Sequence, residues 1–204
     1  MADLPFELAD PGLAGQLLGS LDVEGKIARA IETIGPMGGR DVVLLGGGST
    51  RAGQLEALGA RLVLAADPAA LDRLPAESAD VVVGFWSSLR ADAEFRDDDL
   101  RAAQRVLRHD GVLLAVHDYG RDDVAVLLGD RPEYSSWSRR DGWFLGNGFR
   151  IRVVHAFWTF DSMDTIRAFL GPAFGERGAA LGATLTRPRL RYNVAVYHRI
   201  KTGR

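Results

Sequence analysis

The chain has 204 residues, of which 47% are hydrophobic and 25% are charged, and these values are typical of a single globular domain. Lys and Arg total 25 against 27 Asp and Glu, so the net charge of -2 gives no overall positive field to attract nucleic acid or an anionic membrane. The sequence contains no cysteine, which excludes thiol nucleophiles, disulfides and thiolate metal sites. We therefore expect a soluble, cytoplasmic protein whose partner is a small molecule.

Residues 1–40 are expected to form a helical preface. Apolar residues recur at helical spacing at Val23, Ile27, Ile31 and Ile34, and the glycine-rich stretch 35–39 ends the pattern. The helix at residues 23–34 is one candidate for a lid over the binding site.

A compact strand, helix and strand unit follows. The apolar run 42–45 is closed by Gly46, Gly47 and Gly48, residues 50–58 have a helical pattern, and a second apolar run, 62–66, ends at Asp67. Such units build parallel sheets with helices on both faces. Residues 41–120 are therefore expected to form the binding core.

The alternation of strands and helices continues to the end of the chain. Apolar runs at 81–85 and 112–116 flank a helix at 98–107, and long strands are expected at 149–160 and 190–200. A short helix at 122–128, a loop through Pro132 and an aromatic-rich helix at 135–145 are expected before the first long strand. Helical pieces at 163–181, broken at Gly171 and Pro172, are expected between the two long strands. The sequence thus predicts one α/β domain, mostly parallel, whose C-terminal part (121–204) adds an antiparallel strand pair.

The glycine turn and Asp67 suggest a nucleoside-containing cofactor. Glycines let a ligand approach the backbone, and the N–H groups of the following helix point toward it. Asp67 lies about 20 residues beyond the first glycine, where an acid meets ribose hydroxyls. The alternative is a tight turn with Asp67 as a helix cap ahead of Pro68. A nicotinamide dinucleotide is disfavoured because Arg51 stands where its fingerprint needs a third glycine.

Four segments in order, 42–50, 58–67, 74–83 and 105–114, resemble the class I S-adenosylmethionine-dependent methyltransferases. The resemblance covers about residues 40–120 and implies a Rossmann-like methyltransferase fold that binds S-adenosylmethionine. It implies that Gly46 and Gly48 bind the methionine end of the cofactor, with Gly47 and Ser49 as further cofactor-binding residues. It also implies that Asp67 binds the ribose and that Phe85 and Trp86 lie beside the transferred methyl group.

Three departures from that family's pattern stand out. Leu44 replaces a usual acid, Thr50 replaces a third glycine, and only residues 68–79 separate the second and third apolar runs. That segment has room for a turn of helix and a loop. We therefore expect a sheet that lacks the family's third strand.

His117, with Asp118 and Tyr119 beside it, ends the run 112–116 and is the best-placed candidate base. His117 and Tyr119 are the candidate catalytic residues, with the alternative that His117 only caps the strand end or packs against a loop. No metal site is expected, because the four histidines are scattered and the acids at 97–99 are typical of a helix N-terminus.

The leading hypothesis is an S-adenosylmethionine-dependent methyltransferase acting on an unidentified small molecule, with residues 131–137 as a second candidate lid. One alternative is a catalytically inactive methyltransferase-like binding or assembly protein, and a weaker one is an NAD(P)-dependent oxidoreductase. Aromatic residues concentrated in the last third either fill the core or form a self-association face, which leaves a homodimer open.

Overall fold

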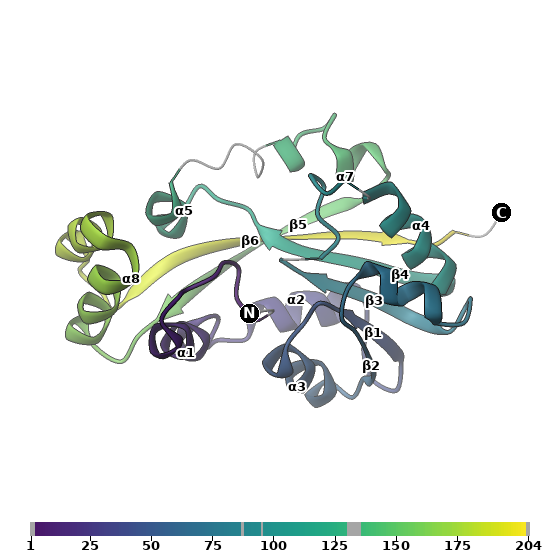
Figure 1. The fold of residues 1–204 in the computed structure, drawn as a ribbon, viewed down its shortest axis with the longest axis horizontal. Coiled ribbons are helices and arrows are strands. Elements are labelled where there is room, and N and C mark those ends of the chain that lie inside the picture. Colours follow the sequence, from purple (N-terminus) through teal and green to yellow (C-terminus); the bar gives the residue numbers. More distant parts are fainter. Residues whose placement is uncertain (1–2, 87, 95, 130–135, 203–204) are drawn as a thin grey trace.

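A computed structural model describes residues 3–86, 88–94, 96–129 and 136–202 of the chain. Its core is one six-stranded sheet with the order β2-β1-β3-β4-β6-β5 (Figure 1). The first four strands run parallel, while β6 is antiparallel to both β4 and β5. The strands are β1 (Asp41–Leu45), β2 (Arg61–Ala65), β3 (Ala79–Phe85), β4 (Leu107–Asp118), β5 (Arg150–Thr159) and β6 (Arg189–Ile200). The predicted mostly parallel sheet with an antiparallel C-terminal pair is confirmed.

Helices cover both faces of the sheet, with α1, α2 and α3 on one side and α4 and α7 on the other (Figure 1). Among the described residues, none of the helices combines the length and the apolar character needed to cross a bilayer. The helices are α1 (Pro11–Ser20), α2 (Lys26–Ile34), α3 (Ser49–Ala57), the 3-10 helix η1 (Pro68–Arg73), α4 (Arg96–Val106), α5 (Asp123–Leu128), α7 (Trp143–Gly146) and α8 (Met163–Thr184).

The predicted absence of a strand between β2 and β3 is confirmed for the described residues, so β2 is an edge strand. In the described part of the chain, β2 pairs only with β1, and η1 is the one regular element between β2 and β3. Val63 and Leu64 on β2 are therefore 44% and 63% exposed. Ion pairs hold the amino ends of β1 and β3 together, since Arg108 contacts Asp80 at 2.9 Å and Asp41 at 2.8 Å. Asp80 is thus part of the amino edge, far from the glycine turn.

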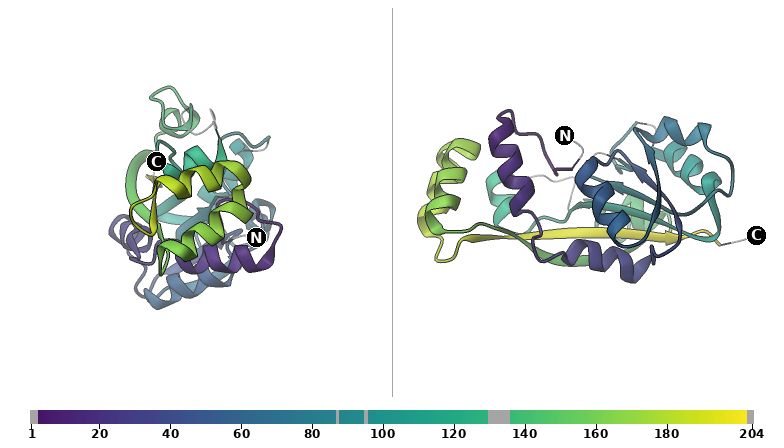
Figure 2. Two further views of the ribbon diagram at one scale, coloured as in Figure 1. Left: turned by 90° about the vertical axis from the view of Figure 1, so that its left-hand side faces the viewer. Right: turned by 90° about the horizontal axis from the view of Figure 1, so that it is seen from below.

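The two antiparallel strands extend past the carboxyl edge of the parallel strands. Asp118, the last residue of β4, pairs with Val194, so residues 189–193 of β6 continue beyond it alongside the second half of β5. Helix α8 joins these strands at the far end, where α1 lies beside it (Figure 2). Helix α5 packs against β6 and α8. This extension forms a wall beside the carboxyl edge, where ligands bind in open parallel sheets.

Several predicted boundaries were wrong. The described part of residues 1–40 contains two helices in place of the one expected. The second, α2, packs on a face of the sheet with Ile27 and Ile31 buried, so it is part of the core and is not the lid that the sequence suggested. The helix at 163–184 passes through Gly171 and Pro172 and breaks at Gly175, whose φ of 59° and ψ of -140° only glycine adopts readily.

The expected helix at 135–145 is also wrong as one element. A turn closed by the Gly142 N–H and the Arg139 carbonyl precedes α7, which starts at Trp143. An added Cβ at Gly142 would overlap the Ser136 carbonyl, so the chain reverses too tightly there for a continuous helix. Ser135 and most of the second candidate lid, residues 131–135, lie outside the described residues.

Candidate functional site

The glycine turn between β1 and α3 is shaped by two neighbours. Gly46 has a left-handed φ of 60°. An added Cβ at Gly47 would lie 2.5 Å from the Leu44 side chain, and one at Gly48 would overlap the carboxylate of Asp3. Leu44 therefore fills the space under the turn, where the resemblance leads one to expect an acid.

Asp3 lies on the turn and accepts hydrogen bonds from three backbone N–H groups. Its carboxylate is 3.0 Å from the nitrogen of Gly48 and 3.1 Å from those of Thr50 and Arg51. These groups form the N-terminus of α3, where the helix dipole favours a negative charge. The turn is thus a carboxylate-binding site whose occupant comes from the chain itself.

Arg51 fills the space between the turn and β3. Its guanidinium lies 4.8 Å from the ring centre of Trp86 and 5.7 Å from that of Phe85, while it donates to Gln54 at 2.7 Å and to the Asp3 carbonyl at 3.3 Å. The side chain is only 2% exposed, and this burial lowers the pKa of Arg51 from its usual value. The predicted cofactor residues Phe85 and Trp86 are therefore buried against an arginine.

Trp86 connects this region to the end of β4. The residue has a φ of 41°, uncommon for an aromatic residue. Its indole N–H donates to the hydroxyl of Tyr192 at 3.0 Å, and that hydroxyl donates a short hydrogen bond to Asp118. Burial raises the pKa of Tyr192 well above its usual value, so the phenol stays protonated and remains a donor.

A cavity of about 450 Å³, lined in part by Tyr192, opens beyond the carboxyl end of β4. This volume is within the usual range for small-molecule sites. Acidic, basic and aromatic side chains of β4, the following turn, α5 and β6 line it together with apolar residues; the polar and aromatic ones are Asp118, Tyr119, Arg121, Asp122, Asp123, Arg191 and Tyr192.

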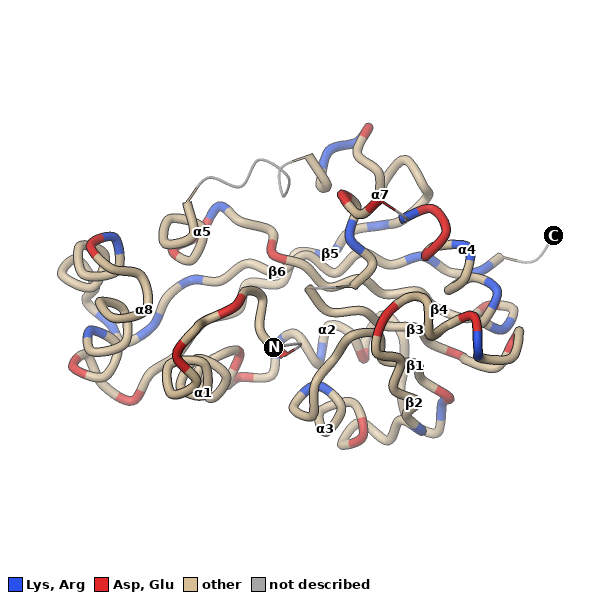
Figure 3. The backbone as a smooth tube through the Cα atoms, in the orientation of Figure 1, with Lys and Arg blue, Asp and Glu red and all other residues tan. Residues whose placement is uncertain are grey.

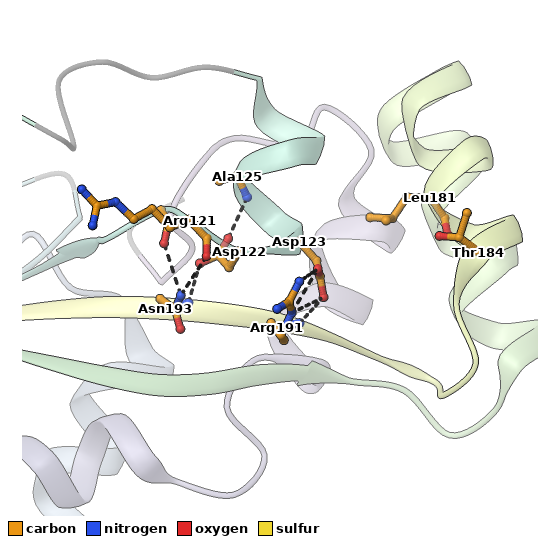
Figure 4. Close-up of polar contacts among 9 residues, drawn as sticks. Arg121, Asp122, Asp123, Ala125, Leu181, Thr184, Arg191 and Asn193 are labelled. Atoms are coloured by element: carbon orange, nitrogen blue, oxygen red, sulfur yellow. Dashed lines mark hydrogen bonds and ion pairs between the residues drawn. The ribbon is translucent and has the colours of Figure 1, made fainter.

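The walls of the cavity are fixed by Asp122 and Asp123 (Figure 4). Asp122 accepts from the backbone nitrogens of Asn193 at 2.6 Å and Ala125 at 2.8 Å, which joins the start of α5 to β6. Asp123 pairs with Arg191 at 2.7 Å. Burial raises the pKa of Asp122, even though both hydrogen bonds favour its charged form. Acidic and basic segments are interspersed here, as along the whole chain (Figure 3).

The two candidate catalytic residues lie on the same face of the sheet, opposite Asp118 and Tyr192. Tyr119 borders the cavity, but it packs against the apolar cluster that contains Trp137 and Phe144, under the guanidinium of Arg121 at 5.6 Å. His117 lies among the same two rings, and its Nε2 lies 3.1 Å from the Leu89 carbonyl. Burial lowers the pKa of His117 to about 4, which keeps the imidazole neutral.

Asp67 lies at the carboxyl end of β2 and is exposed. Its side chain accepts from the Ala70 N–H at 2.9 Å and so caps η1, the alternative that the sequence left open. One carboxylate oxygen makes this bond. Because β1 and β2 are parallel, the exposed Asp67 lies at the same edge of the sheet as the glycine turn. Ser49 is the first residue of α3 beside that turn.

Sequence reasoning missed most of the polar groups that meet here. Asp3 gave no signal, because nothing local links it to a turn 45 residues away. Tyr192 lies within an apolar strand pattern, and its position depends on the antiparallel pairing of β6 with β4. Asp122 and Asp123 could have been noticed as acids close behind a strand end.

No model of a known protein family matches the sequence, and no curated protein matches it either. Solved structures do share the fold. One is a protein assigned as a type II methyltransferase from Anaeromyxobacter dehalogenans, with 18% identity over 87% of this chain and 96% of that one and a TM-score of 0.52.

Two further structures are similar at the same level. A protein assigned as a methyltransferase, solved in complex with the Haloferax volcanii Trm112 methyltransferase activator, has 14% identity over 95% of this chain and 93% of that one, with a TM-score of 0.54. The YcgJ protein of Bacillus subtilis has 15% identity over 89% and 100% of the two chains, with a TM-score of 0.50. At such identities the likeness concerns the fold, and the chain has the fold of the class I methyltransferases.

Proposed function

We propose that this protein is an S-adenosylmethionine-dependent methyltransferase that acts on a small molecule. The observation that carries the proposal is the glycine turn, whose N–H groups at Gly48, Thr50 and Arg51 bind a carboxylate. The methionine end of the cofactor carries a carboxylate and its ribose carries two hydroxyls. The N–H donors of the turn suit the first group and the exposed Asp67 carboxylate, an acceptor, suits the second, so the hydrogen-bonding groups at this edge fit the cofactor.

S-adenosylmethionine supplies a methyl group on a positively charged sulfur, and aligning the acceptor with that methyl provides most of the catalysis. The acceptor site is assigned to the cavity beyond β4, which is lined in part by Tyr192, the hydrogen-bond partner of Trp86. Asp118 orients the Tyr192 hydroxyl. Tyr119 and Asp122 offer polar contacts to an acceptor, and a carboxylate there takes up the proton of an acceptor that carries one.

A second candidate, a methyltransferase-like protein without catalysis, is favoured by one specific observation. Leu44, Arg51 and Asp3 occupy the space around the turn, and the arginine is buried against the aromatic side chains of β3. In this candidate the occupied turn stays closed to the cofactor at any concentration. Cofactor binding is therefore the property that separates the two candidates.

Calorimetric titration with S-adenosylhomocysteine tests the proposal, with Asp67→Ala as the informative variant. Losing hydrogen bonds from the ribose to a charged carboxylate is expected to weaken binding roughly ten- to a hundredfold. Asp72→Ala is the matched control, because Asp72 is an exposed acid on the same short helix, and it should bind as the wild type does.

NAD(H) and NADP(H) complete the experiment, since binding of either one in preference would favour the oxidoreductase. Absence of heat with S-adenosylhomocysteine up to millimolar concentration, in the wild type and in the Asp3 variants described below, would contradict the methyltransferase proposal.

A further inference from the structure

The carboxylate of Asp3 is held at the place that the proposed function gives to the carboxylate of the cofactor. It accepts from the N–H groups of Gly48, Thr50 and Arg51, and its backbone carbonyl accepts from the Arg51 guanidinium. Asp3 is only 9% exposed. Both carboxylates require the same three donors, so they cannot be bound at the same time.

The absence of a side chain at Gly48 serves this contact directly. An added Cβ at that position would overlap the Asp3 carboxylate. The glycine that the resemblance assigns to close approach of the cofactor thus provides close approach of the chain's own acid in this structure. The contact resembles a bound ligand in its number of charge-assisted hydrogen bonds.

The residues after Asp3 are anchored separately from the turn. Leu4 is 4% exposed in the core, and the ring of Phe6 lies 5.8 Å from that of Trp158 and 5.7 Å from that of Phe174. These contacts hold the segment near the turn whether or not Asp3 is bound there. Release of Asp3 therefore requires movement of very few residues, and its local concentration at the turn stays high.

We propose that Asp3 is an intramolecular latch that competes with the carboxylate of the cofactor for the N–H groups of the glycine turn. This inference rests on the proposed function and adds a regulatory device to it. The latched form does not bind the cofactor. The apparent affinity is therefore the intrinsic affinity multiplied by the fraction of molecules in which Asp3 is released. Any condition or partner that removes Asp3 from the turn raises cofactor affinity.

The experiment compares two probes, S-adenosylhomocysteine and methylthioadenosine, by calorimetry. The first has the carboxylate and the second lacks it, so only the first competes with Asp3. Asp3→Ala is expected to bind S-adenosylhomocysteine at least about tenfold more tightly than the wild type, with affinity for methylthioadenosine unchanged. Asp3→Asn keeps the shape of the side chain without its charge and should show an intermediate gain, which covers the case in which Asp3→Ala folds poorly.

Asp10→Ala is the matched control. Asp10 also accepts two backbone N–H bonds at a helix start, from Gly12 at 2.7 Å and Leu13 at 3.0 Å, but it caps α1. Its loss should leave both affinities at the wild-type value. A second readout is the backbone amide NMR signals of Gly48, Thr50 and Arg51, which should shift in Asp3→Ala without ligand.

Each outcome has one meaning. Equal or weaker binding of S-adenosylhomocysteine by the Asp3 variants, while methylthioadenosine binds all proteins, would overturn the latch and leave the proposed function standing. Binding of neither probe by any variant would overturn the proposed function and the latch with it. A gain for both probes would show general opening of the site, which contradicts competition for the carboxylate donors.

Discussion

Lowering the pH from 6.5 to 4 is expected to cost the folded protein about 3 kcal/mol through His117 alone. Burial lowers the pKa of His117 from 6.5 to about 4, so the fold favours the neutral imidazole. Below pH 6.5 the unfolded chain binds a proton that the folded chain does not. The stabilisation is therefore complete above pH 6.5 and is lost as the pH falls toward 4.

Urea unfolding of the wild type and of His117→Asn at several pH values between 7 and 4 measures this effect. The asparagine variant should be less stable at pH 7, because it leaves space beside Trp137 and Phe144, but its stability should fall less steeply with acid. His109→Asn is the control, since this exposed histidine pairs only with Asp110 in the described contacts. Equal pH slopes for the wild type and His117→Asn would contradict the buried, neutral histidine.

Replacing Trp158 with alanine is expected to lower the free energy of unfolding by about 3–5 kcal/mol. Trp158 is completely buried, and its ring lies 5.8 Å from Phe6, 6.3 Å from Phe174 and 5.7 Å from Tyr192. The side chain thus joins the segment after Asp3, helix α8 and the wall of the cavity. We expect Trp158→Ala to loosen the cavity as well as the core.

Thermal or urea unfolding checks this prediction with two comparisons. Trp143 is half-buried and donates its indole N–H to the exposed Asp97, so Trp143→Ala should cost clearly less. Trp158→Phe keeps most of the ring contacts and removes an indole N–H that has no partner among the described residues, so its cost should also be small. A loss below about 1 kcal/mol in Trp158→Ala would show that this contact is not a centre of the fold.

The parallel core was predictable because its signals are local. Short apolar runs such as Val42 to Leu45, closed by glycines and separated by helical patterns, admit few arrangements other than a parallel sheet. The shortness of the segment between Asp67 and Ala79 was enough to predict the missing strand. The positions of helix breaks were harder to predict. Glycine and proline mark several positions where a helix can break, and packing selects one of them, here Gly175.

The site was predictable only in part because it depends on contacts between distant segments. Alternation along β4 places His117 and Asp118 on opposite faces, but the sequence does not say which face meets Tyr192. Asp3 and Arg51 occupy the turn through a meeting of two segments 48 residues apart. The strand ends therefore remain a prediction as binding positions, while the partners of their side chains required the structure.

A crystal structure of the protein grown with saturating S-adenosylhomocysteine would show which carboxylate the glycine turn binds when the ligand is present. We expect the ligand's carboxylate to accept from the N–H groups of Gly48, Thr50 and Arg51, its ribose hydroxyls to contact Asp67, and Asp3 to have moved away. Asp3 still bound at the turn, with the ligand absent or bound elsewhere, would contradict both the cofactor site and the latch.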